Sequence, residues 1–307
     1  MARNALGREL PETFQGRRVV PYRDPWSTRP EGLRATRPLK RVDPGQSKLA
    51  FNLQEAIERC GLRDGMTIAT HHHLRNGDYL LNHVVRMIDH MGLKDIKIAS
   101  SSVHPVHAEL VPLIRDGVVT GLECGVNGLI GELCSKGELT CPITVRSHGG
   151  RARAVSTGQV PIDVAFVAAP CCDEYGNMNG ALGPSAFGSL GYAFTDALYA
   201  RHVIAVTDNL VPFPAAPASI SQADVDWVVR MEKLGDPKKI VSTTTRVTTD
   251  PVGLQIARYA TQVIEASGYL KDGFAFQTGS GGTSLAVAEN VRNLMRARKI
   301  KGSFGCG

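Results

Sequence analysis

Two kinds of hydrophobic pattern alternate along most of the chain. In one, a short run of apolar residues is uninterrupted, which is typical of strands buried on both faces of a sheet. In the other, apolar residues recur every three or four positions, as in amphipathic helices. The predicted strands cover 66–70, 96–99, 118–123, 143–146, 164–168 and 202–207, and helices are expected over 48–60, 78–92 and 106–115. This alternation predicts an α/β fold with a parallel sheet.

Polar or glycine-rich clusters follow five of these predicted strands. The clusters are His71–His73, Ser100–His104, Ser147–Gly150, Asp173–Asn177 and Asp208–Asn209. Parallel strands all end at one edge of their sheet, and open α/β sheets bind ligands outside these carboxyl ends. We therefore expect the five clusters to lie along one edge and to form a binding site.

Composition divides the chain into three parts. Residues 1–48 are rich in Arg, Pro and Gly, which predicts an extended arm over the surface. Residues 49–217 carry the alternating pattern and predict a first α/β domain, which ends in the proline-rich stretch 212–217. Residues 218–307 predict the start of a second α/β domain, with strands over 239–242 and 274–277 and with Asp250 and Pro251 starting a helix. The chain ends soon after a further helix, so the second domain is predicted to be incomplete.

The totals exclude several classes of protein. The chain has 307 residues, 43% of them hydrophobic and 21% charged, and a net charge of +6. The positive charge favours anionic ligands, but basic residues do not form runs with aromatic residues, so nucleic acid is not an expected partner. No stretch is apolar enough for a signal peptide or a membrane span. The seven cysteines are scattered without a C-x-x-C motif, which predicts a reduced cytoplasmic protein without disulfides or zinc.

The candidate substrate-binding residues are the cationic, hydrogen-bonding and glycine residues of the edge clusters. They are His71, His72, His73, Arg75, Ser147, His148, Gly149, Gly150, Arg151, Asn177, Asp208 and Asn209. Imidazole and guanidinium groups would bind a carboxylate or phosphate. Three successive histidines leaving a strand point to alternate sides, so no metal site is predicted. Structural alternatives stay open: a buried histidine, a solvated basic helix face at Arg151 and Arg153, and ordinary turn chemistry for the Asp and Asn residues.

A glycine-rich turn lies between a predicted strand and a predicted helix near the end of the chain. It runs from Gln277 to Gly282, and Gln277, Gly279, Gly281 and Gly282 are the candidate catalytic residues. Such a turn aims backbone N–H groups at an anion or a developing oxyanion. The alternative is a tight turn that needs glycine for conformational reasons. Adjacency in the sequence does not by itself identify a catalytic nucleophile. This applies to Ser147 with His148 and to Cys171 with Cys172.

Several longer motifs occur in a fixed order through nearly the whole chain. They include His71-His72-His73-Leu74-Arg75-Asn76-Gly77-Asp78, Ser147-His148-Gly149-Gly150-Arg151, Asp173-Glu174-Tyr175-Gly176-Asn177, Thr207-Asp208-Asn209-Leu210-Val211-Pro212 and Gln277-Thr278-Gly279-Ser280-Gly281-Gly282. Together they resemble the citrate lyase alpha subunit family of the coenzyme A transferase superfamily. The resemblance implies coenzyme A transferase-like tandem α/β domains with the active site between them.

The resemblance also implies a reaction and partners. Such subunits work in an oligomeric cytoplasmic complex with a beta lyase subunit and a gamma acyl carrier protein. They convert acetyl carrier and citrate into citryl carrier and acetate, and the beta subunit then forms oxaloacetate and acetyl carrier. This chain would bind no cofactor itself and would use the thioester of the carrier's coenzyme A-like group. No glutamate nucleophile is implied, so Glu174 and Glu289 are interpreted as structural.

Family chains continue well beyond the glycine turn, so this chain is expected to be C-terminally truncated. Three functions therefore stay open. The first is the citrate transferase, and the second is a non-catalytic subunit that binds the carrier protein or the lyase partners. The third is a relative that acts on citramalate or uses free coenzyme A.

Overall fold

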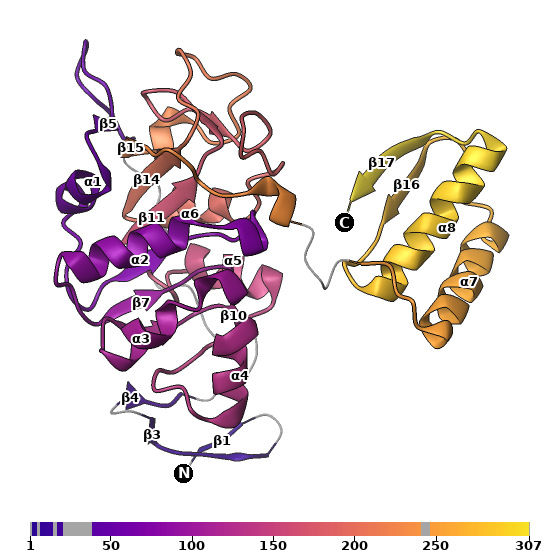
Figure 1. Ribbon diagram of the computed structural model, residues 1–307, viewed down its shortest axis with the longest axis horizontal. Coiled ribbons are helices and arrows are strands. Elements are labelled where there is room, and N and C mark those ends of the chain that lie inside the picture. Colours follow the sequence, from indigo (N-terminus) through magenta and orange to yellow (C-terminus); the bar gives the residue numbers. More distant parts are fainter. Residues whose placement is uncertain (1, 5–6, 15–16, 21–38, 241–245, 307) are drawn as a thin grey trace. The chain divides into compact units, whose positions relative to one another are not determined.

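The computed structural model describes residues 2–4, 7–14, 17–20, 39–240 and 246–306. The chain divides into two compact units, Met1–Ile240 and Val241–Gly307. The first unit is built around a parallel sheet with helices on both faces, and the second contains two helices and a pair of strands (Figure 1).

The main sheet of the first unit has seven strands. Their order is β5 (Leu49–Ala50), β15 (Trp227–Arg230), β14 (His202–Thr207), β11 (Val164–Ala168), β6 (Thr67–Ala69), β7 (Ile96–Ile98) and β9 (Val119–Leu122). Every neighbouring pair is parallel. The predicted α/β fold with a parallel sheet is therefore confirmed, and the carboxyl ends of all seven strands share one edge.

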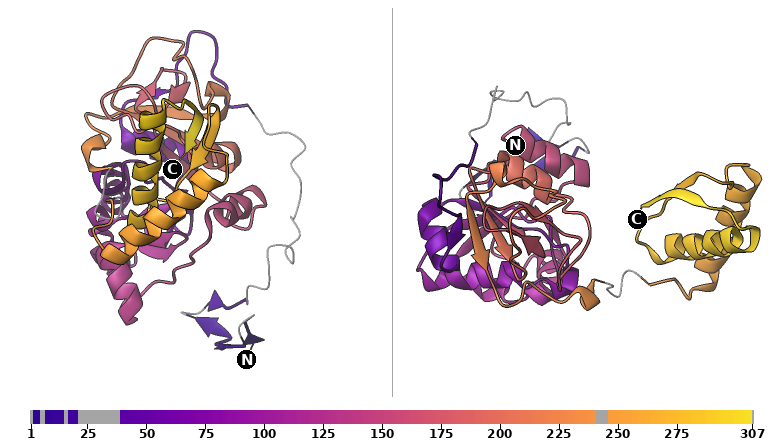
Figure 2. Two further views of the ribbon diagram at one scale, coloured as in Figure 1. Left: turned by 90° about the vertical axis from the view of Figure 1, so that its right-hand side faces the viewer. Right: turned by 90° about the horizontal axis from the view of Figure 1, so that it is seen from above.

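Alternate residues of the central strands pack into two separate hydrophobic cores, one on each face of the sheet. In β11, Val164 and Phe166 pack with α1 (Leu53–Cys60), α2 (Leu80–His90) and α3 (Leu110–Arg115). Ala165 and Val167 pack on the other face with α5 (His148–Ser156) and α6 (Ala193–Tyr199). Because successive side chains of a strand point to opposite faces, the unbroken apolar runs of the sequence serve both layers at once. Figure 2 shows the ribbon of the sheet and its helices from two further directions.

The remaining elements of the first unit are short. Helix α4 is Gly128–Lys136, and the 3₁₀ helices are η1 (Arg75–Gly77), η2 (Pro105–His107), η3 (Gln222–Asp224) and η4 (Pro237–Lys239). Four two-residue strand pairs are β1 (Ala2–Arg3) with β2 (Glu9–Leu10), β3 (Thr13–Phe14) with β4 (Arg17–Arg18), β8 (Ser102–Val103) with β10 (Gly125–Val126), and β12 (Cys171–Cys172) with β13 (Met178–Asn179).

Two predicted elements of the first unit differ from the structure. Residues 143–146 form no strand; Ile143 makes a single bridge to Leu122 at the edge strand β9. The helix expected over 48–60 begins only at Leu53, because Leu49 and Ala50 pair with β15. Asn52 caps this helix by accepting a hydrogen bond from the backbone N–H of Glu55, which fixes its start.

The boundary between the units lies later than the sequence indicated. A second domain was expected from residue 218, but Trp227–Arg230 is inserted between β14 and β5, and the first unit extends to Ile240. The end of the expected arm also belongs to this unit. The buried Lys48 ammonium group donates to the carbonyl oxygens of Lys40 and Val225, each at 2.6 Å, and to that of Gln222. A four-residue strand and a single anchoring lysine leave no periodic signal in a sequence.

The second unit consists of α7 (Pro251–Ala266), β16 (Phe274–Gln277), α8 (Gly282–Arg298) and β17 (Gly302–Cys306), with β16 and β17 parallel. Asp250 caps α7 as predicted, accepting from the Gly253 N–H at 2.7 Å. The final strand β17 was not expected. Of the strand expected over 239–242, Lys239 lies in η4, and residues 241 and 242 lie outside the described residues.

The outer face of α7 carries an unexpected apolar stripe. In the sequence, apolar residues recur at helical spacing along this helix and predict a buried stripe of Val252, Ile256, Ala260, Val263 and Ile264. In the structure, however, Val252, Ile256 and Val263 are 66%, 53% and 69% exposed. The helix instead buries its small residues Gly253, Ala257 and Thr261. Small side chains let two helices approach closely, so the larger apolar residues of the same helix are turned outward.

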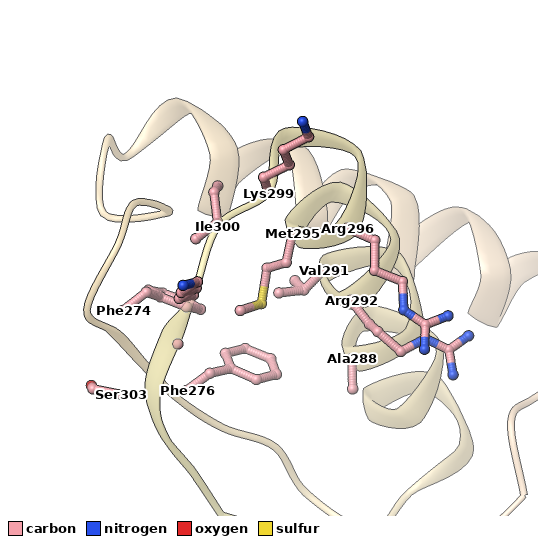
Figure 3. Close-up of a pocket in the computed structure, with 12 residues that line it drawn as sticks. Phe274, Phe276, Ala288, Val291, Arg292, Met295, Arg296, Lys299, Ile300 and Ser303 are labelled. Carbon is pink, nitrogen blue, oxygen red and sulfur yellow. The ribbon is translucent and has the colours of Figure 1, made fainter.

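A groove of about 710 Å³ lies between α8 and the two strands of this unit (Figure 3). Phe274, Phe276 and Met295 give it an apolar floor, and Arg296 and Lys299 stand among its other lining residues.

Candidate functional site

The first histidine after β6 is an internal residue. His71 is only 1% exposed, and its Nε2 accepts a hydrogen bond from the Ala168 N–H at 3.3 Å. A neutral imidazole that accepts at one nitrogen carries its proton on the other, so Nδ1 of His71 is the donor. It faces the carboxylate of Asp196 at 3.8 Å, which is too long for a hydrogen bond. His71 therefore joins the ends of β6 and β11 inside the protein.

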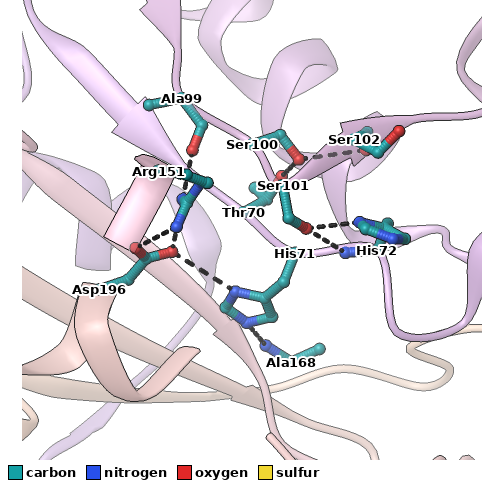
Figure 4. A network of polar contacts seen from close by, with 10 residues as sticks. All are labelled: Thr70, His71, His72, Ala99, Ser100, Ser101, Ser102, Arg151, Ala168 and Asp196. Carbon is teal, nitrogen blue, oxygen red and sulfur yellow. Dashed lines mark hydrogen bonds and ion pairs between the residues drawn. The ribbon is translucent and has the colours of Figure 1, made fainter. Parts of the chain in front are cut away.

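Asp196 and Arg151 form a buried ion pair beside His71 (Figure 4). Both terminal nitrogens of Arg151 donate to the carboxylate oxygens of Asp196 at 2.9 Å, and one of them also donates to the Ala99 carbonyl at 2.7 Å. Such a bidentate pair is strong and geometrically specific. Protein acceptors thus occupy these two nitrogens, whereas Nε of Arg151 has no hydrogen-bond partner among the described residues.

This ion pair brings the start of α5 to the carboxyl edge of the sheet, because Ala99 directly follows β7. Ser147 caps α5, and its hydroxyl oxygen accepts from the Gly150 N–H at 3.1 Å. His148 and Gly149 are exposed, and the His148 ring stacks on Tyr192 with centroids 5.7 Å apart. Residues 147–150 therefore lie at the predicted edge even though no strand precedes them.

His72 and His104 come from the loops after the neighbouring strands β6 and β7. Their ring centroids are 5.0 Å apart. The Ser101 hydroxyl lies 2.5 Å from Nδ1 of His72 and accepts from the His72 backbone N–H at 3.2 Å. His104 is followed closely by His107, whose Nδ1 accepts from the His104 N–H at 3.0 Å and whose Nε2 lies 3.3 Å from a carboxylate oxygen of Asp78.

His73 and Arg75 complete this group of residues. The His73 ring stacks on Phe187 with centroids 4.5 Å apart. Arg75 adopts a left-handed conformation with φ of 51°, which is unfavourable for a residue with a side chain and is found preferentially at functional sites. Within the described part of the chain its guanidinium has no hydrogen-bond or ion-pair partner. Arg75 is thus a cation that is open to an anionic ligand.

The imidazoles of this group are held in the neutral form. Burial, followed by the nearby His104 and Arg75, lowers the pKa of His72 to about 3. Burial and His107 lower the pKa of His104 to about 4, and burial with His71 lowers the pKa of His73 to about 2. At neutral pH these rings offer N–H donors instead of full positive charges.

The Asp173–Asn177 loop is held together internally. One carboxylate oxygen of the fully buried Asp173 accepts from the backbone N–H groups of Tyr175, Gly176 and Asn177. The other accepts from the Asn177 amide and from the Ala215 N–H. The side-chain oxygen Oδ1 of Asn177 accepts from the Gln222 backbone N–H. Asn177 therefore braces the loop, which is the turn chemistry left open by the sequence.

Asp208 acts in a similar way after β14. Its two carboxylate oxygens accept from the Ser185 hydroxyl at 2.8 Å and from the Leu234 N–H at 3.1 Å. The neighbouring Asn209 donates its backbone N–H to the Thr207 hydroxyl and is partly exposed. Within the described ranges the Asn209 side chain makes no internal hydrogen bond, so of the sequence-predicted residues after β11 and β14 it is the one open to a ligand.

The adjacent cysteines do not have the environment of a nucleophile. Burial raises the pKa of both Cys171 and Cys172, and Asp173 raises it further. A reactive cysteine needs the opposite shift. Among the described residues, no three His, Cys, Asp or Glu side chains are grouped as metal ligands. None of the helices within that same part of the chain is both long enough and apolar enough to cross a membrane.

The glycine-rich turn precedes α8 in the second unit. Gln277, Gly279 and Gly281 are exposed, and Gly281 is the N-cap residue. Because Gly281 has no side chain, no capping oxygen occupies the N–H groups of the first helical turn. The Thr278 hydroxyl donates to the Ser284 carbonyl at 3.0 Å and shapes the turn. The arrangement fits the anion-binding use of a helix N-terminus.

Reasoning from the sequence missed the residues that organise this edge. Asp196 lies on α6 and looks like an ordinary helical aspartate, so nothing in the sequence links it to Arg151 or His71. His104 belongs to one of the five predicted clusters, but it was not among the candidate binding residues. The signal that was available for His104 was its position just after a predicted strand.

Comparison with known proteins identifies relatives over most of the chain. The family model for the citrate lyase alpha subunit matches residues 46–307. The citrate lyase alpha chain of Escherichia coli K12 is 48% identical over 261 residues, which are 85% of this chain and 51% of that protein. A crystal structure from Streptococcus mutans, described as the alpha subunit of citrate lyase in complex with citrate, superimposes with a TM-score of 0.84 at 46% identity and covers 99% of this chain and 60% of that one.

A more distant structure supports the fold alone. An acyl-CoA transferase from Escherichia coli O157:H7 has a TM-score of 0.56 at 14% identity, over 87% of this chain and 63% of that one. The predicted coenzyme A transferase-like fold is therefore confirmed. The chain spans about half the length of the curated relatives it matches.

Proposed function

The chain belongs to the citrate lyase alpha subunit family, and from this premise we propose that it moves the thiol of an acyl carrier protein from acetate to citrate. The substrates would be acetyl carrier and citrate, and the products citryl carrier and acetate. The observation that carries the proposal is the group of unpaired donors at the carboxyl edge of the sheet, where Arg75 and the imidazoles of His72 and His104 lie together.

Citrate would bind through its carboxylates at this edge. Arg75 supplies the positive charge, and the neutral imidazoles supply N–H donors. The exposed start of α5, at His148 and Gly149, adds a helix N-terminus, which attracts anions. His71 and Arg151 are proposed to position this surface from behind, since both are buried in the Asp196 network.

The chemistry needs no general base, because a carboxylate is already ionised at neutral pH. One citrate carboxylate oxygen attacks the carbonyl carbon of the acetyl thioester and forms a tetrahedral oxyanion. The oxyanion collapses, the C–S bond breaks, and the thiolate leaves a mixed anhydride of acetate and citrate. The thiolate then attacks the citryl carbonyl carbon of this anhydride, and acetate leaves with the electron pair of the broken C–O bond.

Each oxyanion requires hydrogen-bond donors that are already in place, because such preorganised donors commonly contribute more to the rate of acyl transfer than any other effect. We propose that the N–H groups that begin α8, after Gly279 and Gly281, serve this purpose. The thioester would come from the coenzyme A-like group of a carrier protein, and a beta lyase subunit would then cleave the citryl product. This chain would supply binding and orientation and would hold no cofactor of its own.

The reaction is tested by following the thioester directly. The purified chain is incubated with acetyl-charged carrier protein, or with acetyl coenzyme A, and with citrate, and the thioester is analysed by mass spectrometry. A change from the acetyl to the citryl mass with release of acetate is expected. The Arg75→Gln variant is expected to turn over at least about tenfold more slowly, since a charge-assisted contact is removed.

Arg63→Gln is the matched control, because Arg63 lies in an exposed loop before β6 and is expected to keep full activity. Carrier binding without any citryl product, by a chain that remains folded, would contradict the transferase and favour the non-catalytic binding subunit. Formation of a citramalyl product in preference to the citryl product would instead favour the citramalate relative.

A further inference from the structure

The turn that carries Arg75 has few bonds of its own. Arg75 is the first residue of η1, and its backbone φ is 51°. Its N–H donates to the His72 carbonyl oxygen at 2.9 Å, and the Gly77 N–H donates to the Leu74 carbonyl oxygen at 2.8 Å. A left-handed conformation persists in a residue with a side chain only where the surrounding structure enforces it. The segment that packs against the turn therefore decides how firmly Arg75 is placed.

That segment is 234–236, which lies far from the turn in the sequence. The Tyr79 N–H, just after the turn, donates to the Leu234 carbonyl oxygen at 3.1 Å. In the opposite direction, the Asp236 N–H donates to the Gly77 carbonyl oxygen at 2.9 Å. The two backbone bonds point in opposite directions, as in a short antiparallel pair, so the 234–236 segment and the turn are held in register.

Two glycines allow these backbones to approach each other. A methyl group at Gly77 would collide with the Asp236 carbonyl oxygen, and one at Gly235 would collide with the Gly77 carbonyl oxygen. Both glycines are buried. A displacement of the 234–236 segment would therefore move or loosen the turn that carries Arg75.

Asp208 ties the 234–236 segment to the main sheet. It directly follows β14, and one of its carboxylate oxygens accepts from the Leu234 N–H at 3.1 Å. The other accepts from the Ser185 hydroxyl at 2.8 Å. Both oxygens thus have internal donors, and the negative charge of Asp208 would repel a carboxylate ligand. Direct binding of an anion is therefore not the role that this geometry supports.

We propose that Asp208 is a positioning residue for the anion-binding site: it acts through the 234–236 segment on the turn that presents Arg75, and it does not contact the substrate. The identity of the anion, citrate, rests on the proposed function. An arginine that is held in place before the ligand arrives loses less conformational freedom on binding than one on a loose turn. Asp208 would thus strengthen citrate binding without being part of the binding surface.

Isothermal titration calorimetry of the whole chain with citrate tests this role in a cycle of single and double variants. Asp208→Ala leaves the Leu234 N–H without its acceptor, so affinity for citrate should fall about tenfold. Arg75→Gln should weaken binding at least as much. In the Arg75→Gln background, Asp208→Ala should change affinity by less than about twofold, because its effect passes through Arg75. Losses that multiply in the double variant would overturn the inference, and so would full affinity in a folded Asp208→Ala variant.

Asp208→Asn separates position from charge. The amide oxygen can accept from the Leu234 N–H, and the amide N–H can donate to the Ser185 hydroxyl oxygen. The segment should stay tied, and affinity for citrate should stay within about twofold. A tenfold change in this isosteric variant would show that the charge itself matters and would overturn the positioning role. Asp116→Ala, at an exposed aspartate that ends α3, is the matched control and should leave affinity unchanged.

Gly235→Ala examines the same connection at its other end and serves if the Asp208→Ala chain does not fold. The added methyl group should push the 234–236 segment away from Gly77 while Asp208 keeps both of its oxygens. Citrate binding should weaken, and the loss should again be absent in the Arg75→Gln background. Unchanged affinity in a Gly235→Ala chain that thermal unfolding shows to be folded would overturn the inference.

The outcomes for this inference and for the proposed reaction differ. Multiplying losses, together with citryl product in the thioester experiment, would overturn the positioning role and leave the transfer standing. Coupled losses without citryl product would support the positioning role and contradict the transfer. Absence of citrate binding, or an Arg75→Gln variant with full affinity, would overturn the positioning role together with the proposed carboxylate site.

Discussion

At the scale of single residues, the candidate residues are of two kinds: some are accessible to a ligand, and others are buried and position the accessible ones. Arg75 and His148 lie where an anion can reach them, and His71 and Arg151 are in the interior. The sequence does not distinguish the two kinds, because a histidine or an arginine near a strand end can be either accessible or buried. Burial and the presence of an internal partner separate them.

The Asp196–Arg151 pair gives a residue-scale prediction. Asp196→Asn leaves the Arg151 guanidinium buried without its counter-charge, so the free energy of unfolding should fall by about 3–5 kcal/mol. Urea denaturation measures this change. A double variant, Arg151→Met with Asp196→Leu, replaces both charges by apolar side chains and should recover most of the lost stability.

A loss in the single variant that the double variant does not recover would contradict this account. The pair would then be needed for more than neutralising a buried charge.

At the scale of elements, the two helix N-termini carry the proposed chemistry. Neither start is explained by hydrophobic periodicity: α5 depends on the Ser147 cap and on the buried Arg151, and α8 begins at Gly281, which has no capping side chain. What each helix offers is a set of backbone N–H groups, whose direction is fixed by the helix axis.

The start of α5 is tested by two neighbouring glycines. A methyl group at Gly149 would meet nothing, whereas one at Gly150 would lie 2.8 Å from the Ser147 hydroxyl oxygen. Gly149→Ala should therefore raise stability by about 0.5–1 kcal/mol, as alanine does in a helix. Gly150→Ala should lower stability by roughly 1 kcal/mol through the cap. Thermal unfolding compares them.

Calorimetry with citrate adds a functional measure to this pair. If an anion approaches the exposed backbone at Gly149, the stabilised Gly149→Ala variant should nevertheless bind citrate more weakly. An unchanged affinity for citrate would show that Gly149 affects only the stability of the helix and is not approached by the anion.

The start of α8 offers a second pair. Gly281 has open space where a Cβ would lie, but a Cβ at Gly282 would approach the Arg246 carbonyl oxygen to 2.9 Å. Gly281→Ala should cost less than about 1 kcal/mol, and Gly282→Ala about 1–3 kcal/mol, because backbone atoms would have to move. Circular dichroism during heating measures both. Equal costs would mean that the close approach to Arg246 is not maintained.

At the scale of the whole molecule, the division into units determines what a shortened chain can do. Residues 1–240 contain all seven strands of the main sheet and the proposed carboxylate site. A chain ending at residue 240 should fold cooperatively and bind citrate, but should not catalyse transfer, since the glycine turn before α8 is absent.

A chain ending at residue 217 is the matched comparison. It lacks β15, which lies between β14 and β5, and it loses the carbonyl oxygens of Gln222 and Val225 that bind Lys48. It should fail to fold. Circular dichroism and calorimetry with citrate distinguish the two chains. Stable folding of the 1–217 chain would restore the boundary that composition suggested.

The sequence by itself determined the α/β class, the alternation of strands and helices that implies a parallel sheet, and the family. These depend on periodicities of a few residues and on ordered motifs, which a chain displays without being folded. The polar clusters after β6, β7, β11 and β14 were also predictable, because a strand end is a local property and parallel strands share one edge.

The tertiary structure alone decided the rest. Three findings depend on contacts between residues that are distant in the sequence. Trp227–Arg230 adds a strand to the main sheet, and Asp196 neutralises Arg151. Helix α7 exposes Val252, Ile256 and Val263. The same holds for the roles of the histidines. Burial and neighbouring charged or imidazole groups lower the pKa of His72, His73 and His104, and these surroundings arise only when the chain is folded.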